Sequence, residues 1–111
     1  MGCKLYVARK YVVEYSGYGE FNWQQEEFGN LMEALGIDLC GESGSGELWS
    51  FEVSKENWER GMETLKSDKE NEAIDQALES LGKTREEMLG IMETYLRESD
   101  PDYEWLEFCF L

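Results

Sequence analysis

The chain closes at residues 103–111 with the sequence YEWLEFCFL, in which Leu106, Phe108 and Phe110 share one side. Alternation of apolar and polar residues with a period of two, with aromatic residues among them, predicts a β-strand with one buried face. We expect this last strand to return to the same sheet as strands that come earlier in the chain.

Two earlier stretches show the same alternation. In residues 4–15, KLYVARKYVVEY, the odd positions form one apolar face that is interrupted only by Arg9, and the even positions include Lys4, Lys10 and Glu14. Residues 47–53, ELWSFEV, place Trp49, Phe51 and Val53 on one face. Both stretches predict strands, and the length of the first leaves room for a bulge or a bend.

A helix is predicted between the first two strands. Its N-cap is expected at Asn22, with Gln25 as the capping-box partner three residues later, and Gly36 is expected to end it. Its apolar stripe follows the helical spacing i, i+3, i+4, i+7 and consists of Phe28, Leu31, Met32 and Leu35.

Three more helices are predicted between the second and third strands. Ser54 is expected to cap the first of them. The patterns S-x-x-E at Ser67 and T-x-x-E at Thr84 predict capping boxes for the next two, with Gly82 between them. Residues 67–98 therefore predict a helical hairpin.

The resulting order is β-α-β-α-α-α-β, which is typical of an α+β fold. We expect a small three-stranded sheet covered by helices, including the helical hairpin. Residues 1–111 contain no internal repeat and no composition shift that would mark a boundary, so a single acidic domain is predicted.

The residue types do not assemble a familiar catalytic or metal site. The sequence has no histidine, which removes the usual triads, the commonest general base and the usual zinc ligands. The glycine-rich stretch 41–46 leads into a strand and is flanked by Glu42 and Glu47, so it does not suit phosphate. We expect no enzyme activity, no cofactor and no metal ion.

Cysteine usage and hydropathy predict where the protein acts. Cys3, Cys40 and Cys109 are odd in number and none lies at C-x-x-C spacing, which favours reduced thiols. There is no apolar leader at the N-terminus and no apolar run of membrane-spanning length. The expectation is a cytoplasmic protein that does not contact a membrane.

Charge is the most unusual property of the sequence. It has 25 acidic and 10 basic residues, a net charge of −15. Between Lys10 and Lys55 there is no other basic residue. Residues 55–97 carry both acidic and basic residues, and all charged residues after Arg97 are acidic. Such a surface repels nucleic acid directly and attracts basic proteins.

The charge pattern leads to a functional hypothesis. If the base-free segments form one face, their carboxylates could imitate the phosphates of a nucleic acid and occupy the binding surface of a basic enzyme, as an anti-CRISPR or anti-restriction inhibitor would. Aromatic residues beside these acids suit a protein interface. The candidate partner-binding residues are Tyr18, Glu20, Phe21, Trp23, Glu26, Glu27, Glu33 and Asp38.

Two other interpretations stay open. The acidity could serve solubility alone. Alternatively, the protein could be a non-catalytic regulatory module that binds through apolar and aromatic surface, at the helical hairpin 67–98 or at a sheet edge.

Overall fold

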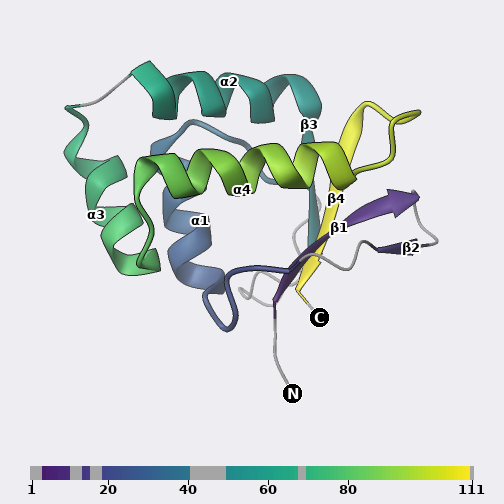
Figure 1. The fold of residues 1–111 in the computed structure, drawn as a ribbon, viewed down its shortest axis with the longest axis horizontal. Helices are drawn as coiled ribbons and strands as arrows, with labels where there is room; N and C mark the ends of the chain where they lie inside the picture. The colour runs from purple at the N-terminus through teal and green to yellow at the C-terminus, as the bar shows by residue number, and fades with distance from the viewer. Residues whose placement is uncertain (1–3, 11–13, 16–18, 41–49, 68–69, 111) are drawn as a thin grey trace.

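The computed structural model describes residues 4–10, 14–15, 19–40, 50–67 and 70–110 of the chain (Figure 1). Its long strands and its helices follow the predicted order β-α-β-α-α-α-β, which confirms the α+β fold. The strands are β1 (Leu5–Lys10), β2 (Glu14–Tyr15), β3 (Ser50–Ser54) and β4 (Trp105–Phe110), and the helices are α1 (Gln25–Ala34), α2 (Lys55–Ser67), α3 (Glu72–Leu81) and α4 (Arg85–Glu98).

The last strand lies in the middle of the sheet. The strand order is β2-β1-β4-β3, and every pairing is antiparallel. On one side of β4, Phe110 is opposite Leu5, and on the other Phe108 is opposite Phe51. The expectation that the closing segment pairs with earlier strands is confirmed.

The segment 4–15, predicted as a strand with room for a bulge or a bend, is divided into two strands. The segment forms β1 and the two-residue strand β2, which pair with each other, and the register shifts between Ala8 and Lys10. Antiparallel pairing of neighbouring strands requires the chain to reverse direction between them. Alternation of residue types continues through such a reversal and does not show where it occurs.

The core lies between one face of the sheet and the helices. Along β4 the buried residues alternate with half-buried ones, as the period of two requires. The ring of Phe108 packs on Phe51 of β3 at 5.2 Å between centroids, on Trp58 of α2 at 5.0 Å and on Tyr95 of α4 at 5.3 Å. This aromatic cluster joins the sheet to two helices.

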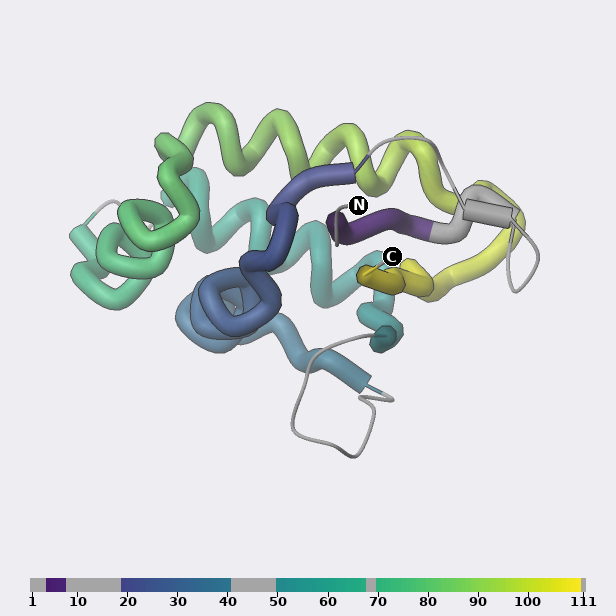
Figure 2. The backbone as a smooth tube through the Cα atoms, turned by 90° about the horizontal axis from the view of Figure 1, so that it is seen from below, coloured from purple at the N-terminus to yellow at the C-terminus, as the bar shows by residue number. Residues whose placement is uncertain are grey.

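The helices form two pairs, α2 with α4 and α1 with α3. Figure 1 shows α2 and α4 running along each other, whereas α3 lies beside α1 at the end of the molecule remote from the strands. Figure 2 shows the same arrangement after a quarter turn. Both helices of the predicted hairpin 67–98 are present, and each of them packs on an earlier helix. The pair is therefore part of the common core.

Several helix ends follow the predicted chemistry. The Thr84 hydroxyl accepts a hydrogen bond from the Glu87 N–H, and the Glu87 carboxylate accepts one from the Thr84 N–H, which confirms this capping box. The Ser54 hydroxyl accepts a bond from the Asn57 N–H at 3.1 Å at the start of α2. Gly36 and Gly82 have φ angles of 73° and 70° after α1 and α3, the left-handed conformation that a helix stop requires.

Two predicted N-caps are wrong. Ser67 is the last residue of α2 and its hydroxyl donates to the Glu63 carbonyl at 2.8 Å, whereas α3 is capped by Asn71. The N-cap of α1 is Gln24 instead of Asn22. Serine and asparagine also occur beside caps, so the pattern alone leaves the boundary uncertain by a few residues.

The hydroxyl of Tyr95 fixes the segment that precedes α1. It donates to the Leu5 carbonyl at 2.6 Å and accepts from the Glu20 N–H at 3.1 Å. The Glu20 carbonyl in turn accepts from the Leu5 N–H at 2.7 Å. One buried side chain of α4 therefore holds the chain before α1 against β1. In the part of the chain that the structure describes, no helix has the length and apolar character to cross a membrane.

Candidate interaction surface

The predicted acidic residues lie on α1 and in the segments that precede and follow it in the chain. Glu26 and Glu33 are exposed, on the side of the helix opposite its buried stripe, and Glu27 is half-buried. Glu20, before the helix, has its carboxylate 3.7 Å from the ammonium of Lys83. Asp38, after the helix, is exposed.

The three predicted aromatic residues have different outcomes. Phe21 is only 2% exposed, so the expectation that it contributes to a partner-binding surface is wrong. Its ring lies 5.1 Å from that of Phe28 and 6.5 Å from that of Tyr95, where it closes the core beside α1. Trp23 is 61% exposed. Tyr18 lies outside the described residues.

Asp38 lines two hollows that adjoin each other. The first, of about 280 Å³, runs along the end of α1 and is also lined by Glu33. The second, of about 250 Å³, is also lined by Cys40, by Glu56 of α2 and by Trp105 of β4. The loop after α1 thus connects the surface of α1 with the start of α2.

A third and larger hollow continues the same surface. It has a volume of about 770 Å³ and shares Glu56 and Trp105 with the second hollow. Its lining comes from the first turns of α2 and from the turn that leads into β4. We call the carboxylates along these three hollows the acidic surface: Glu33, Asp38, Glu56, Glu59, Asp102 and Glu104.

Hydrogen bonds hold together the three segments that form the acidic surface. The Asp38 N–H donates to Asn57 Oδ1 at 2.7 Å, which joins the loop after α1 to α2. Lys55 joins α2 to the turn before β4, because its N–H donates to the Glu104 carbonyl at 2.9 Å and its Nζ to the Asp100 carbonyl at 2.7 Å. Within that turn, the Asp102 N–H donates to Asp100 Oδ1 at 2.9 Å.

The bases on this surface do not reverse its charge. Six carboxylates line the three hollows, against Lys55 and Arg60. The guanidinium of Arg60 is 2.7 Å from the Glu56 carboxylate, four residues earlier on α2. A pair this exposed adds little stability, but it directs the guanidinium towards its own helix. The surface therefore keeps a net negative charge.

Aromatic rings accompany the carboxylates in the largest hollow. Tyr103 and Trp105 are half-buried there, beside Asp102 and Glu104. Carboxylates bind lysine and arginine through charge-assisted hydrogen bonds, and aromatic faces attract the same cations. The combination suits basic side chains of a protein partner.

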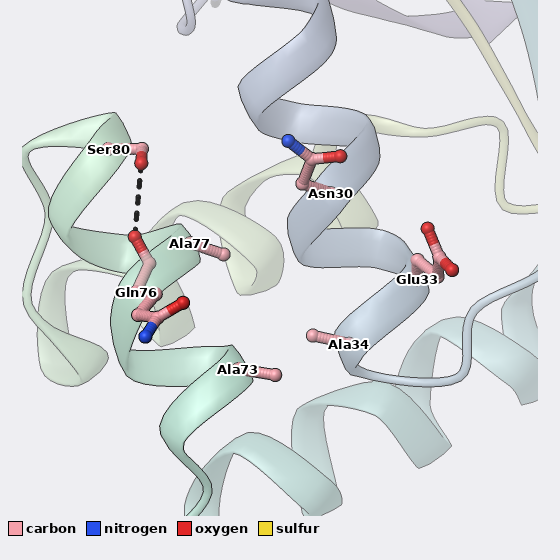
Figure 3. A pocket seen from close by; sticks show the side chains of 7 residues that line it. All are labelled: Asn30, Glu33, Ala34, Ala73, Gln76, Ala77 and Ser80. Atoms are coloured by element: carbon pink, nitrogen blue, oxygen red, sulfur yellow. Dashed lines mark hydrogen bonds between the residues drawn. The ribbon is translucent and has the colours of Figure 1, made fainter.

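A further hollow, of about 490 Å³, lies between α1 and α3 and has a different character (Figure 3). Ala34 of α1 faces Ala73 and Ala77 of α3 across it, whereas Glu33 points away from α3. The Ser80 hydroxyl donates to the Gln76 carbonyl of its own helix at 3.1 Å. Small side chains here let the two helices approach, so this hollow is a packing seam.

The carboxylates of the acidic surface do not converge on one point. Over the described ranges, no three Asp, Glu or Cys side chains converge closely enough to hold a metal ion. Its carboxylates are spread along three segments, which suits contact with an extended basic surface.

Of the six carboxylates of the acidic surface, only Glu33 and Asp38 are among the candidates predicted from the sequence. Asp102 and Glu104 belong to the base-free closing segment but were not among those candidates. Glu56 and Glu59 belong to the mixed-charge region 55–97, where eleven acids and seven bases give a smaller excess of negative charge than in the base-free segments. No local pattern in the sequence marks these two residues, because their place follows from strand pairing. Because Ser54 pairs with Trp105 at the ends of two antiparallel strands, the residues after 54 must lie beside those before 105.

The chain was compared with models of protein families, with curated proteins and with solved structures, and none of these matches it.

Proposed function

We propose that this protein binds a basic, nucleic-acid-binding surface of a protein partner in the cytoplasm and thereby keeps DNA or RNA from it. It would act as a non-catalytic inhibitor of the anti-CRISPR or anti-restriction type. The observation that supports this proposal is the acidic surface, because carboxylates from three distant segments line adjoining hollows there.

The physical basis is the resemblance between rows of carboxylates and rows of phosphates. Duplex DNA carries one charge per ~1.7 Å of its axis, and proteins that bind it present lysine and arginine to this field. A surface with fixed carboxylates can engage the same lysines and arginines. Because hydrogen bonds already hold the loop after α1, α2 and the turn before β4 together, the backbone of these segments has little conformational entropy to lose on binding.

The net charge supports the choice of partner. At −15 the protein repels nucleic acid itself, whereas it accelerates encounters with a basic protein. An inhibitor that competes with DNA for the same surface must gain affinity from the charges that DNA uses. Its affinity should therefore fall steeply as salt is added.

A competition assay tests the proposal. Fluorescein-labelled duplex DNA is bound to each member of a panel of purified basic nucleases, and displacement by this protein is followed by anisotropy at increasing salt. We expect displacement from at least one enzyme, and a loss of about 30-fold or more in potency for the triple variant E59K/D102K/E104K. An effect of this size corresponds to about 2 kcal/mol, which is typical of hot-spot charges.

Two matched variants serve as controls. The triple E70K/E72K/E79K makes the same change in net charge at three exposed positions outside the acidic surface, and it should keep most of the potency. The triple E26K/E27K/E33K tests the residues predicted from the sequence alone. If all three variants lost the same potency, net charge would act without a defined surface. If the wild-type protein displaced DNA from none of the enzymes, the proposal would be contradicted.

The alternative function, docking through an apolar surface, makes the opposite prediction for salt. Apolar association barely changes with ionic strength, whereas binding through carboxylates weakens. The apolar stripes of the hairpin 67–98 are largely used inside the protein, since Ile74, Leu78, Met88 and Met92 are all buried. An apolar contact would therefore need another part of the surface.

A further inference from the structure

Trp23 stands out among the described residues as the large apolar side chain that remains exposed, at 61% of its surface. It belongs to a tight turn before α1, closed by a hydrogen bond of 3.0 Å from the Gln24 N–H to the Phe21 carbonyl. A single exposed apolar residue is ordinary on a protein surface. Two further observations make this one unusual.

The first observation concerns the role that an apolar residue normally has at this position. Trp23 directly precedes the N-cap of α1, where an apolar side chain usually packs on the fourth residue of the helix, here Phe28. Phe21 makes that contact instead, with ring centroids 5.1 Å apart. Trp23 is thus not needed to fix the start of the helix.

The second observation is the backbone conformation. Phe21 and Trp23 have φ angles of 57° and 58°, in the left-handed region that glycine adopts without strain and aromatic residues rarely enter. Burial of the Phe21 ring offsets this cost for Phe21. No comparable burial offsets it for Trp23. A turn of this kind can require a positive φ at its third residue, but it does not require a tryptophan there, and strained residues are often retained for function.

The turn is also fixed by contacts of the residues that precede Trp23. Phe21 is anchored in the core, and Glu20 is bonded to the Tyr95 hydroxyl and to the backbone of Leu5. The indole of Trp23 is therefore carried on a backbone whose position is already determined. Exposed aromatic residues on rigid supports are the usual anchors of protein interfaces, because they bury much area and lose little entropy.

We propose that Trp23 is a docking anchor that inserts into an apolar pocket with a lysine- or arginine-rich rim on the protein partner. The basic rim is inferred from the acidic residues near Trp23. Glu26 is exposed and Glu27 half-buried in the first turn of α1. Glu20 lies beside the turn, with its carboxylate 3.7 Å from the ammonium of Lys83. The same carboxylates disfavour a second copy of this chain and an anionic membrane. The basic character of the partner rests on the proposed function.

The test uses the full chain with Trp23→Gly, which removes the indole and suits the left-handed backbone. Asn22→Gly in the same turn is the matched control, and Trp23→Phe keeps an apolar ring. Biotinylated wild-type protein captures partners from a lysate of the source organism, mass spectrometry identifies them, and each is purified for affinity measurements with all variants. Thermal unfolding of every variant is recorded in parallel.

We expect a basic partner whose affinity falls about 30-fold or more with Trp23→Gly, and much less with Trp23→Phe or Asn22→Gly. The melting temperature of Trp23→Gly should stay within about 8 °C of the wild type, as for an ordinary surface substitution. Capture that does not depend on Trp23 would overturn the proposal. So would a larger fall in melting temperature, which would make Trp23 a structural residue.

Other occupants give distinct results. Dimerisation of the wild type that Trp23→Gly abolishes, or sedimentation with phosphatidylcholine vesicles that requires Trp23, would each overturn the protein partner. The proposed function is tested separately by E59K/D102K/E104K. If that triple loses DNA displacement while Trp23→Gly retains it, the acidic surface stands and the anchor fails; the reverse result would leave the anchor and remove the acidic surface.

Discussion

At the scale of single residues, Gly61 determines how closely the chain after α1 approaches α2. A methyl group added at Gly61 would overlap the Cδ1 atom of Ile37 and lie 2.6 Å from its Cγ1 atom. Ile37 is buried, with 4% of its surface exposed, so its side chain has little room to move aside. The same loop carries Asp38 to the acidic surface, and Gly61 therefore contributes to the position of that carboxylate.

Substitution of Gly61 by alanine should destabilise the protein by about 1–2 kcal/mol. Alanine gains up to about 1 kcal/mol in helix propensity, but overpacking costs about 1–3 kcal/mol. Gly90 is the matched control, because it is exposed on α4 and a methyl group there meets no atom within 4 Å. Gly90→Ala should stabilise by about 0.5–1 kcal/mol. Urea unfolding measures both, and stabilisation by Gly61→Ala would contradict the close contact.

At the scale of elements, the start of α4 depends on a reciprocal capping box with a pH-sensitive member. The Thr84 N–H donates to Glu87 Oε1 at 2.9 Å, and the Glu87 N–H donates to the Thr84 hydroxyl at 3.1 Å. The bond from the Thr84 backbone, followed by the Thr84 side chain, lowers the pKa of Glu87 below its ordinary value of 4.5. Lys83 contributes in the same direction.

A lowered pKa in the folded state makes this contribution depend on pH. Folding favours the ionised form of the Glu87 carboxylate. The stability that this carboxylate adds to the folded protein is therefore fully present above pH 4.5 and is lost as the pH falls through the lower folded pKa. We expect wild type to be more stable than Glu87→Gln near neutral pH and the difference to shrink as the pH falls below 4.5 and through the lowered folded pKa. Unfolding in urea across this range measures it.

Glu93→Gln is the control for this experiment. Glu93 is exposed in the middle of α4, outside the capping box. Its replacement removes the same charge without touching Thr84. If the stability difference for Glu93→Gln followed pH in the same way, the effect would belong to net charge and not to the capping box.

At the scale of the whole molecule, the net charge of −15 opposes the compact state. The carboxylates of the acidic surface line adjoining hollows, and at about 0.01 M salt the Debye length is about 30 Å, so their mutual repulsion is little screened. Adding salt shortens this length and weakens the repulsion. The same charges that would attract a basic partner therefore reduce the stability of the free protein.

The melting temperature should rise by on the order of 5 °C between about 0.01 and 0.3 M sodium chloride, which corresponds to about 1 kcal/mol. Potassium chloride should act equally, because screening depends on ionic strength and not on the cation. A melting temperature that stays constant over this range would contradict the repulsion. An effect of one cation alone would point to specific binding instead.

Elements whose signal is local were predictable from the sequence. The alternation in residues 105–110, the stripe of α1 and the capping box at Thr84 all depend on neighbours within a few positions, because helix and strand geometry set which side chains share a face. The caps at Asn22 and Ser67 failed because several polar residues near one helix end can serve the same purpose.

The sequence by itself determined the order of the helices and the long strands, the acidity and the absence of histidine. Only the tertiary structure decided which charges meet. Pairing of Ser54 with Trp105 brings Glu56 and Glu59 to Asp102 and Glu104, and packing on Phe28 takes Phe21 into the core while Trp23 stays outside. These outcomes depend on long-range strand pairing and on competition for space in one core, which no local pattern of residues records.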